Sequence, residues 1–134
     1  MLAHMKTVAG AEGLPFGDRK MTFNSRLAQE LAKWAEAQGQ GDAFHDAVFR
    51  AYFSDGHNIA QIAVLIELVE GMGLSGAEAE QVLKTRAFRG AVDRDWLRSR
   101  QLGVTAVPTF RCNRQSVVGA QPYAVLAGLV GSGP

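Results

Sequence analysis

The spacing of apolar residues predicts that most of the chain is helical. Apolar positions recur every three or four residues as far as Gly103, as they do on the buried face of a helix. Glycine-rich breaks, such as Gly39-Gln40-Gly41, separate these runs. We therefore expect six helices, whose apolar faces start at Leu2, Leu27, Phe44, Ile62, Val82 and Phe88.

Polar residues with capping chemistry precede several of these helices. Asn24 or Ser25 can cap the second helix and Asp42 the third. Ser75 followed by Glu78 has the spacing of a capping box for the fifth. The sixth helix is expected to run from about residue 85 to residue 102 and to end at Gly103.

The pattern changes after Gly103. Thr109–Cys112 and Gln115–Val118 are short and rich in β-forming residues, and Asn113-Arg114 lies between them, so they predict an antiparallel hairpin. Pro122 suits the first turn of a last helix. The predicted fold class is therefore mostly α with a small C-terminal antiparallel β-hairpin.

This layout predicts two domains, a helical domain over residues 1–103 and a β-β-α part over residues 104–134. Two strands alone form a marginal sheet, and both edges would be unpaired. A β-β-α segment normally completes a larger sheet, whose other strands do not occur in this sequence. We therefore expect the exposed edge to be covered, and self-association into a homo-oligomer is one way to cover it.

Composition limits the classes of partner. With 14 basic and 13 acidic residues the formal charge is +1, so neither nucleic acid nor an anionic membrane is expected as a partner. No run of apolar residues approaches the roughly 20 that a membrane helix needs, and residues 1–10 do not resemble a secretory signal. Cys112 is the only cysteine, which favours a reducing compartment, and we predict a cytoplasmic protein.

The most specific segment is Gly103-Val104-Thr105-Ala106-Val107-Pro108-Thr109-Phe110, followed by Val118-Gly119-Ala120-Gln121-Pro122. It resembles the cis-proline loop of the thioredoxin superfamily, and more closely the C-terminal signature of the FrnE-like branch of the DsbA-like family. Upstream, Asn24-Ser25-Arg26-Leu27-Ala28 and Phe49-Arg50-Ala51-Tyr52-Phe53 resemble the inserted helical domain of that branch. The resemblance covers nearly the whole chain.

The resemblance implies a partial thioredoxin-like, DsbA-like fold. Members of the family exchange thiols and disulfides through a CXXC motif, and the residue before the cis-proline pairs its backbone with the substrate. Val107 and Pro108 match that loop and are the predicted substrate-binding residues, for an extended polypeptide or a thiol substrate. CXXC has no match, because the chain has one cysteine, so we expect no catalytic residue and no cofactor within it.

Two further functions stay open. By this resemblance, the chain begins at about the point where the N-terminal β-α-β half of the family has finished. It is therefore expected to be an incomplete oxidoreductase homologue. A non-catalytic module that binds proteins or itself is the first alternative. The second is a relative of the glutathione-dependent 2-hydroxychromene-2-carboxylate isomerases, which share the fold and the insertion.

The other chemistry-bearing residues have ordinary structural interpretations. Cys112 is expected to be a buried, inert thiol on the same face of the strand as Phe110. The aromatic stripe from Phe44 to Phe53 could line a ligand groove, but core packing is favoured for it, and for Trp34 and Trp96. No metal ligands are predicted, since the three histidines are far apart. These histidines are His4, His45 and His57.

Overall fold

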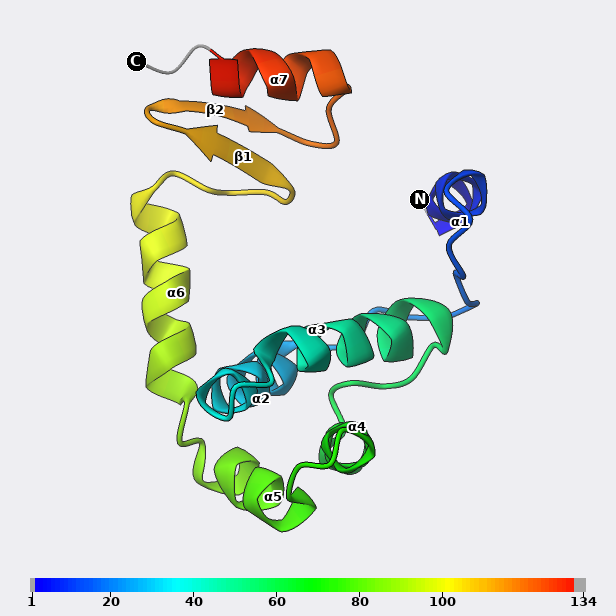
Figure 1. Cartoon of the computed structure of the whole chain (residues 1–134), viewed down its shortest axis with the longest axis vertical. Coiled ribbons are helices and arrows are strands. Elements are labelled where there is room, and N and C mark those ends of the chain that lie inside the picture. The colour runs from blue at the N-terminus through cyan, green and yellow to red at the C-terminus, as the bar shows by residue number, and fades with distance from the viewer. Residues whose placement is uncertain (1, 132–134) are drawn as a thin grey trace. The chain divides into compact units, whose positions relative to one another are not determined.

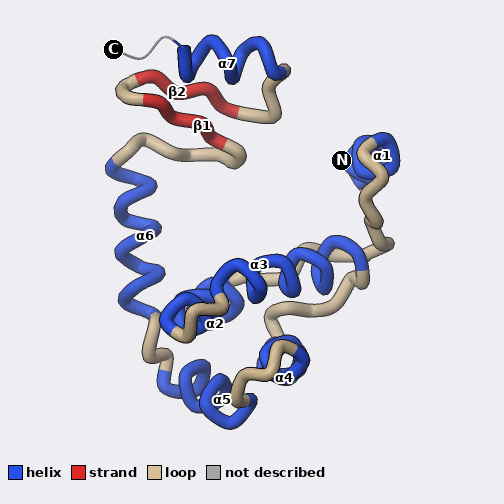
Figure 2. The backbone as a smooth tube through the Cα atoms, in the orientation of Figure 1, coloured by secondary structure: helices blue, strands red, loops and turns tan. Residues whose placement is uncertain are grey.

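The structure is a computed structural model that describes residues 2–131. In chain order the elements are α1 (Leu2–Ala11), α2 (Arg26–Ala37), α3 (Gly41–Phe49), the π-helical turn η1 (Arg50–Ser54), α4 (Ile62–Gly71), α5 (Gly76–Thr85), α6 (Arg89–Gln101), β1 (Thr109–Cys112), β2 (Gln115–Val118) and α7 (Tyr123–Gly131) (Figure 1). Helices dominate, and the two strands form one antiparallel pair (Figure 2). The predicted fold class is confirmed.

The chain divides into two compact units, Met1–Val92 and Asp93–Pro134. This division lies inside α6, whereas the sequence places the domain boundary after Gly103, where helix gives way to extended chain. That boundary stays a prediction. No helix among residues 2–131 is long and apolar enough to cross a membrane.

The first unit is built around α2. This helix packs against α3, α4 and α5, because its apolar residues recur around more than one side. Leu31 and Ala35 are completely buried, and Trp34 is buried as predicted. The core residues that the other helices contribute are Phe44, Leu65, Val69, Ala79 and Leu83.

The caps follow the sequence in part. Ser75 accepts a hydrogen bond from the Glu78 N–H at 3.1 Å, as expected for the start of α5. Before α2, the side chain of Asn24 accepts from the Arg26 N–H at 2.8 Å, while Ser25 occupies the cap position without a side-chain cap bond. The prediction for Asp42 was wrong, because Gln40 occupies the cap position of α3 and Asp42 lies in the first turn of the helix.

The third helix is extended by the π-helical turn η1. Its defining hydrogen bond runs from the Asp55 N–H to the Arg50 carbonyl, at 3.0 Å. The loop before α2 packs onto this turn, where the Gly17 N–H donates to the Phe53 carbonyl at 2.7 Å. A side chain at Gly17 would collide with the Ser54 carbonyl, so this close approach requires glycine.

The sixth helix begins later than predicted. Arg86 follows α5 in the left-handed conformation, with φ 56° and ψ 40°, and α6 starts only at Arg89. The sequence hid this break because glycine or asparagine usually occupies such a position. Arg86 is held there by Glu30 of α2, which accepts from its Nε at 2.8 Å and from its Nη2 at 2.6 Å.

Two aromatic residues depart from the predicted core packing. Phe44 is buried, but Phe49 is 57% exposed and Trp96 is 45% exposed. Trp96 lies on α6, whose sequence is mostly polar, so one aromatic residue does not mark a buried face. The exposure of Phe49 has a different origin, because this residue borders a pocket that is described below.

The second unit contains most of α6, the hairpin and α7. In the hairpin Thr109 pairs with Val118 and Cys112 with Gln115, which are the predicted strand bounds. Asn113 turns the chain with φ 56°, a left-handed conformation that asparagine tolerates better than most residues. α7 begins at Tyr123, so Pro122 immediately precedes the helix instead of lying in its first turn.

Candidate functional site

The loop that carries Val107 and Pro108 connects α6 to β1. Gly103, with φ 77°, ends the helix, and the Val104 N–H donates back to the Ser99 carbonyl at 3.0 Å. This bond closes the last turn in the manner of a glycine C-cap. The chain then leaves the helix and reaches the first strand through a series of bends.

Hydrogen bonds fix the corner at Pro108. The Val107–Pro108 peptide bond is cis. The Thr109 hydroxyl donates to the Ala106 carbonyl at 2.6 Å, across the corner. The Pro108 carbonyl accepts from the Gly119 N–H at 2.8 Å, which extends the hairpin ladder by one residue. The corner is therefore held by the residues on both of its sides.

Val107 is the residue that this corner presents to solvent. Its side chain is 88% exposed, far more than expected for a valine that packs in a core. Within residues 2–131 neither its N–H nor its carbonyl makes a hydrogen bond. A backbone donor and acceptor are thus available beside an exposed apolar side chain.

The unpaired groups of Val107 continue along the outer edge of β1. Paired residues in an antiparallel hairpin alternate between bonding their partner and directing their backbone groups away from it. Pro108 bonds to Gly119, so Phe110 and Cys112 bond to β2, whereas Thr109 and Arg111 direct their backbone groups outward. An extended chain could therefore pair with this edge by β-augmentation.

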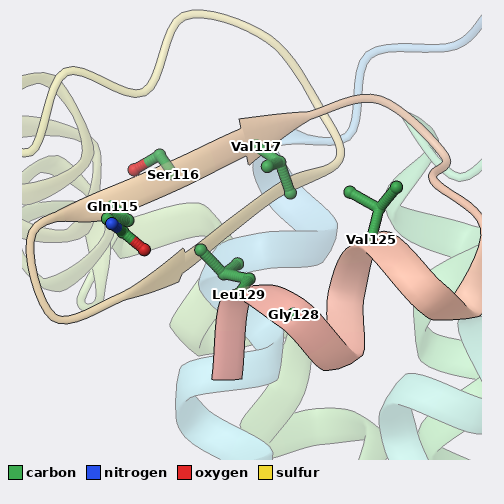
Figure 3. Close-up of a pocket in the computed structure, with 6 residues that line it drawn as sticks. All are labelled: Gln115, Ser116, Val117, Val125, Gly128 and Leu129. Atoms are coloured by element: carbon green, nitrogen blue, oxygen red, sulfur yellow. The ribbon is translucent and has the colours of Figure 1, made fainter. Parts of the chain in front are cut away.

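The inner face of the hairpin packs on α7. Figure 3 shows Val117 of β2 opposite Val125 and Leu129 of α7, with Gln115 near the turn. These residues line a shallow, open hollow of about 450 Å³ between strand and helix. The packing fixes the face of the hairpin that is turned inward and so leaves the edge of β1 accessible in this unit.

Cys112 lies on this inner face. It is half-buried, so the prediction of a buried thiol holds only in part. Arg111 points to the opposite face, where its Nη1 donates to the Leu102 carbonyl at 3.2 Å. That contact ties the first strand to the end of α6. Sequence reasoning missed it, because a basic residue on a strand gives no signal of a helix-capping role.

The three histidines belong to the first unit. All three are exposed, namely His4, His45 and His57. Within residues 2–131, no group of three histidine, cysteine or acidic side chains is arranged to hold a metal ion. Electrostatics at the corner itself are simple, as no acidic or basic side chain flanks Val107 in sequence.

Comparison with known proteins identifies a family and a curated relative. The family model described as DSBA-like thioredoxin domain matches residues 1–131. A curated protein of Bacillus subtilis (strain 168), the uncharacterized protein YwbO, is 34% identical over 96 residues, which are 70% of this chain and 48% of YwbO. The chain therefore spans about half the length of this relative.

Two solved structures are similar along almost the entire chain. One is the cytosolic disulfide reductase DsbM from Pseudomonas aeruginosa with GSH, at 27% identity and a TM-score of 0.65. That match covers 95% of this chain and 67% of DsbM. The second is DsbM from the same organism, at 25% identity and a TM-score of 0.64, covering 96% and 67%.

Proposed function

The chain belongs to the DSBA-like thioredoxin domain family, and we propose that it supplies the substrate-docking part of a thiol-disulfide oxidoreductase. In this proposal Val107 and Pro108 hold an extended polypeptide or a thiol substrate. The redox cysteines are not among these 134 residues, because Cys112 is the only cysteine. A dithiol mechanism needs two.

One observation carries the proposal. Val107 is exposed, and its N–H and carbonyl are unpaired in the described chain at the end of an open strand edge. A substrate strand that pairs there gains backbone hydrogen bonds whatever its sequence, as a protein acting on many disulfides requires. The DsbM structures support the same reading, since DsbM is a disulfide reductase.

The placement of the chain in the FrnE-like branch is part of this proposal and rests on the sequence segments given above. A cytoplasmic location is proposed as well. It is supported by the description of DsbM as cytosolic and by the single cysteine of this chain.

The docking role is tested by binding of a fluorescein-labelled, carboxymethylated insulin B chain, followed by anisotropy. Val107→Pro removes the backbone N–H of Val107, whereas Val107→Ala keeps it and shortens only the side chain. We expect Val107→Pro to bind the peptide about tenfold more weakly than Val107→Ala, because it loses one backbone hydrogen bond to the peptide. Equal affinities for the two variants would contradict docking through the backbone.

Catalysis is tested separately with unmodified insulin. The pure chain is expected to give no turnover in an insulin-reduction assay with dithiothreitol beyond the reductant alone, because it cannot form an intrachain disulfide. Turnover above that background would overturn the assignment of the redox chemistry to residues outside this chain. Addition of glutathione, the compound present in one DsbM structure, to the anisotropy assay shows whether a small thiol competes for the same corner.

Self-association is the second candidate function, and the open edge of the hairpin favours it. The sheet in the described chain has two strands, so each strand has an unpaired edge. Pairing of β1 with β1 of another copy would satisfy these groups around a two-fold axis. Both candidate functions use the same edge, so they are expected to compete.

A further inference from the structure

We propose that the helical unit contains a second binding site, for an uncharged aromatic small molecule, in the pocket between α2 and the continuous helix α3–η1. The pocket has a volume of about 480 Å³, within the range of small-molecule sites. All of its lining residues lie between Thr22 and Ile59, so it belongs to one compact unit. It shares no lining residue with the Pro108 corner.

Side chains of α2 and of its cap residue Ser25 form one wall of the pocket. Ser25, Ala28, Gln29 and Ala32 line the pocket at spacings of three and four residues, so they form one stripe along the helix. Two of the four are alanines, whose side chains end at Cβ. α2 and α3 are packed neighbours, and this stripe leaves a gap between them where larger residues would fill it.

The opposite wall is aromatic. His45, Val48, Phe49 and Tyr52 line the pocket at the same helical spacing on α3–η1. Phe53 follows Tyr52 in the wall, and the two rings meet edge to face with centroids 4.8 Å apart. Both belong to the π-helical turn η1, a helix irregularity that occurs frequently at functional sites.

The pocket has a fixed floor and an accessible rim. Phe44 and Ile59 are 1% and 4% exposed and belong to the core, so the floor is held by packing. Phe49 stands at the rim, half-exposed, with its ring centroid 6.2 Å from His45 and 6.3 Å from Phe53. A flat ligand ring could extend this row of rings, a stacking geometry that aromatic groups prefer.

The charge of the lining selects the ligand class. None of the lining residues carries a carboxylate, ammonium or guanidinium group. The Arg19 guanidinium lies over the Tyr52 ring, with Cζ 4.2 Å from its centroid, but does not line the pocket. An uncharged ligand therefore matches the lining residues, among which a charged one would lose hydration without meeting an opposite charge. The Ser25 hydroxyl, which accepts from Gln29 at 2.9 Å, and the His45 imidazole offer hydrogen bonds to a single hydroxyl or carbonyl of the ligand.

The proposal is tested with 2-naphthol, an uncharged bicyclic phenol, titrated into the ¹⁵N-labelled full chain and followed by NMR. Saturable shifts confined to residues of α2, α3 and η1 are expected. No saturable shifts up to the solubility of the probe, or shifts centred on the hairpin and α7, would overturn the site. This measurement needs no variant, so it does not depend on the folding of one.

A pair of variants tests the aromatic wall. Phe49→Ala removes a ring at the rim, and Tyr123→Ala removes a ring from α7 that is also exposed and lies outside the pocket. We expect Phe49→Ala to weaken 2-naphthol binding about fivefold, the size of one lost aromatic contact, and Tyr123→Ala to leave it unchanged. Equal affinities of the two variants would overturn the pocket as the site.

Discussion

Glu30 is a carboxylate that is buried between two guanidinium groups. It is 1% exposed and accepts from Arg86 at 2.8 and 2.6 Å and from Arg26 at 2.9 Å. The hydrogen bond from Arg86 holds the pKa of Glu30 below its ordinary value, although burial acts in the opposite direction. This triad anchors the left-handed residue that separates α5 from α6.

The lowered pKa of Glu30 predicts how stability depends on pH. A carboxyl group whose folded pKa lies below its unfolded value stabilises the fold above the unfolded pKa, about 4.3 for glutamate. That contribution is lost as the pH falls through the folded value. Glu30→Gln should therefore lower the free energy of unfolding at pH 7 by about 2–4 kcal/mol, measured by urea denaturation. The stability of this variant should also fall less steeply as the pH is lowered below about 5.

A surface glutamate provides the matched control. Glu80 pairs with Lys84 one helical turn away, where the Glu80 side chain is 44% exposed, against 1% for Glu30. Glu80→Gln should cost less than about 1 kcal/mol, since solvent screens such pairs. If both variants lost a similar free energy of unfolding at pH 7, the buried ion pairs of Glu30 would contribute no more than an exposed pair.

At the scale of elements, the hairpin depends on the backbone of Asn113. Its φ of 56° is strained for a β-branched residue and relaxed for glycine. Asn113→Val is expected to destabilise the hairpin by about 1–2 kcal/mol, and Asn113→Gly to change its stability by less than about 0.5 kcal/mol. Hydrogen exchange of the Val117 and Gly119 amides measures the difference; equal protection in both variants would contradict it.

The elements that the sequence predicted well are those with strong local signals. The strand bounds follow from β-forming runs on either side of Asn113-Arg114, and the start of α5 follows from Ser75 and Glu78. The break at Arg86 could not be predicted, because its cause is a contact with Glu30, 56 residues away. Helix propensity depends on residues that are close in sequence, so it does not predict a contact with such a distant residue.

The same distinction applies to the candidate site. The Val107-Pro108 segment was found through its resemblance to a family, and its exposure agrees with the predicted role, which itself stays a prediction. The Arg111 contact to Leu102 and the pocket beside Phe49 were not found, since both depend on how elements pack. The aromatic stripe gave a signal for that pocket, but core packing explains such a stripe equally well.

At the scale of the whole molecule, the open edge of β1 predicts a mass above that of one chain. Sedimentation velocity should detect a dimer whose population rises with concentration, because strand pairing satisfies the outward N–H and carbonyl groups of Thr109 and Arg111. A single species with the mass of one chain at all concentrations would contradict self-association while leaving substrate docking at Val107 possible.

Two variants of Arg111 separate the backbone from the side chain in this prediction. Both Arg111→Pro and Arg111→Ala lose the contact from Nη1 to the Leu102 carbonyl. Only Arg111→Pro also removes the outward N–H, and proline is tolerated on an edge where that group bonds nothing within the chain. We therefore expect Arg111→Ala to sediment as the parent does and Arg111→Pro to sediment as a monomer. Loss of the dimer in both variants would place the interface at the arginine side chain, and its retention in both would exclude pairing through β1.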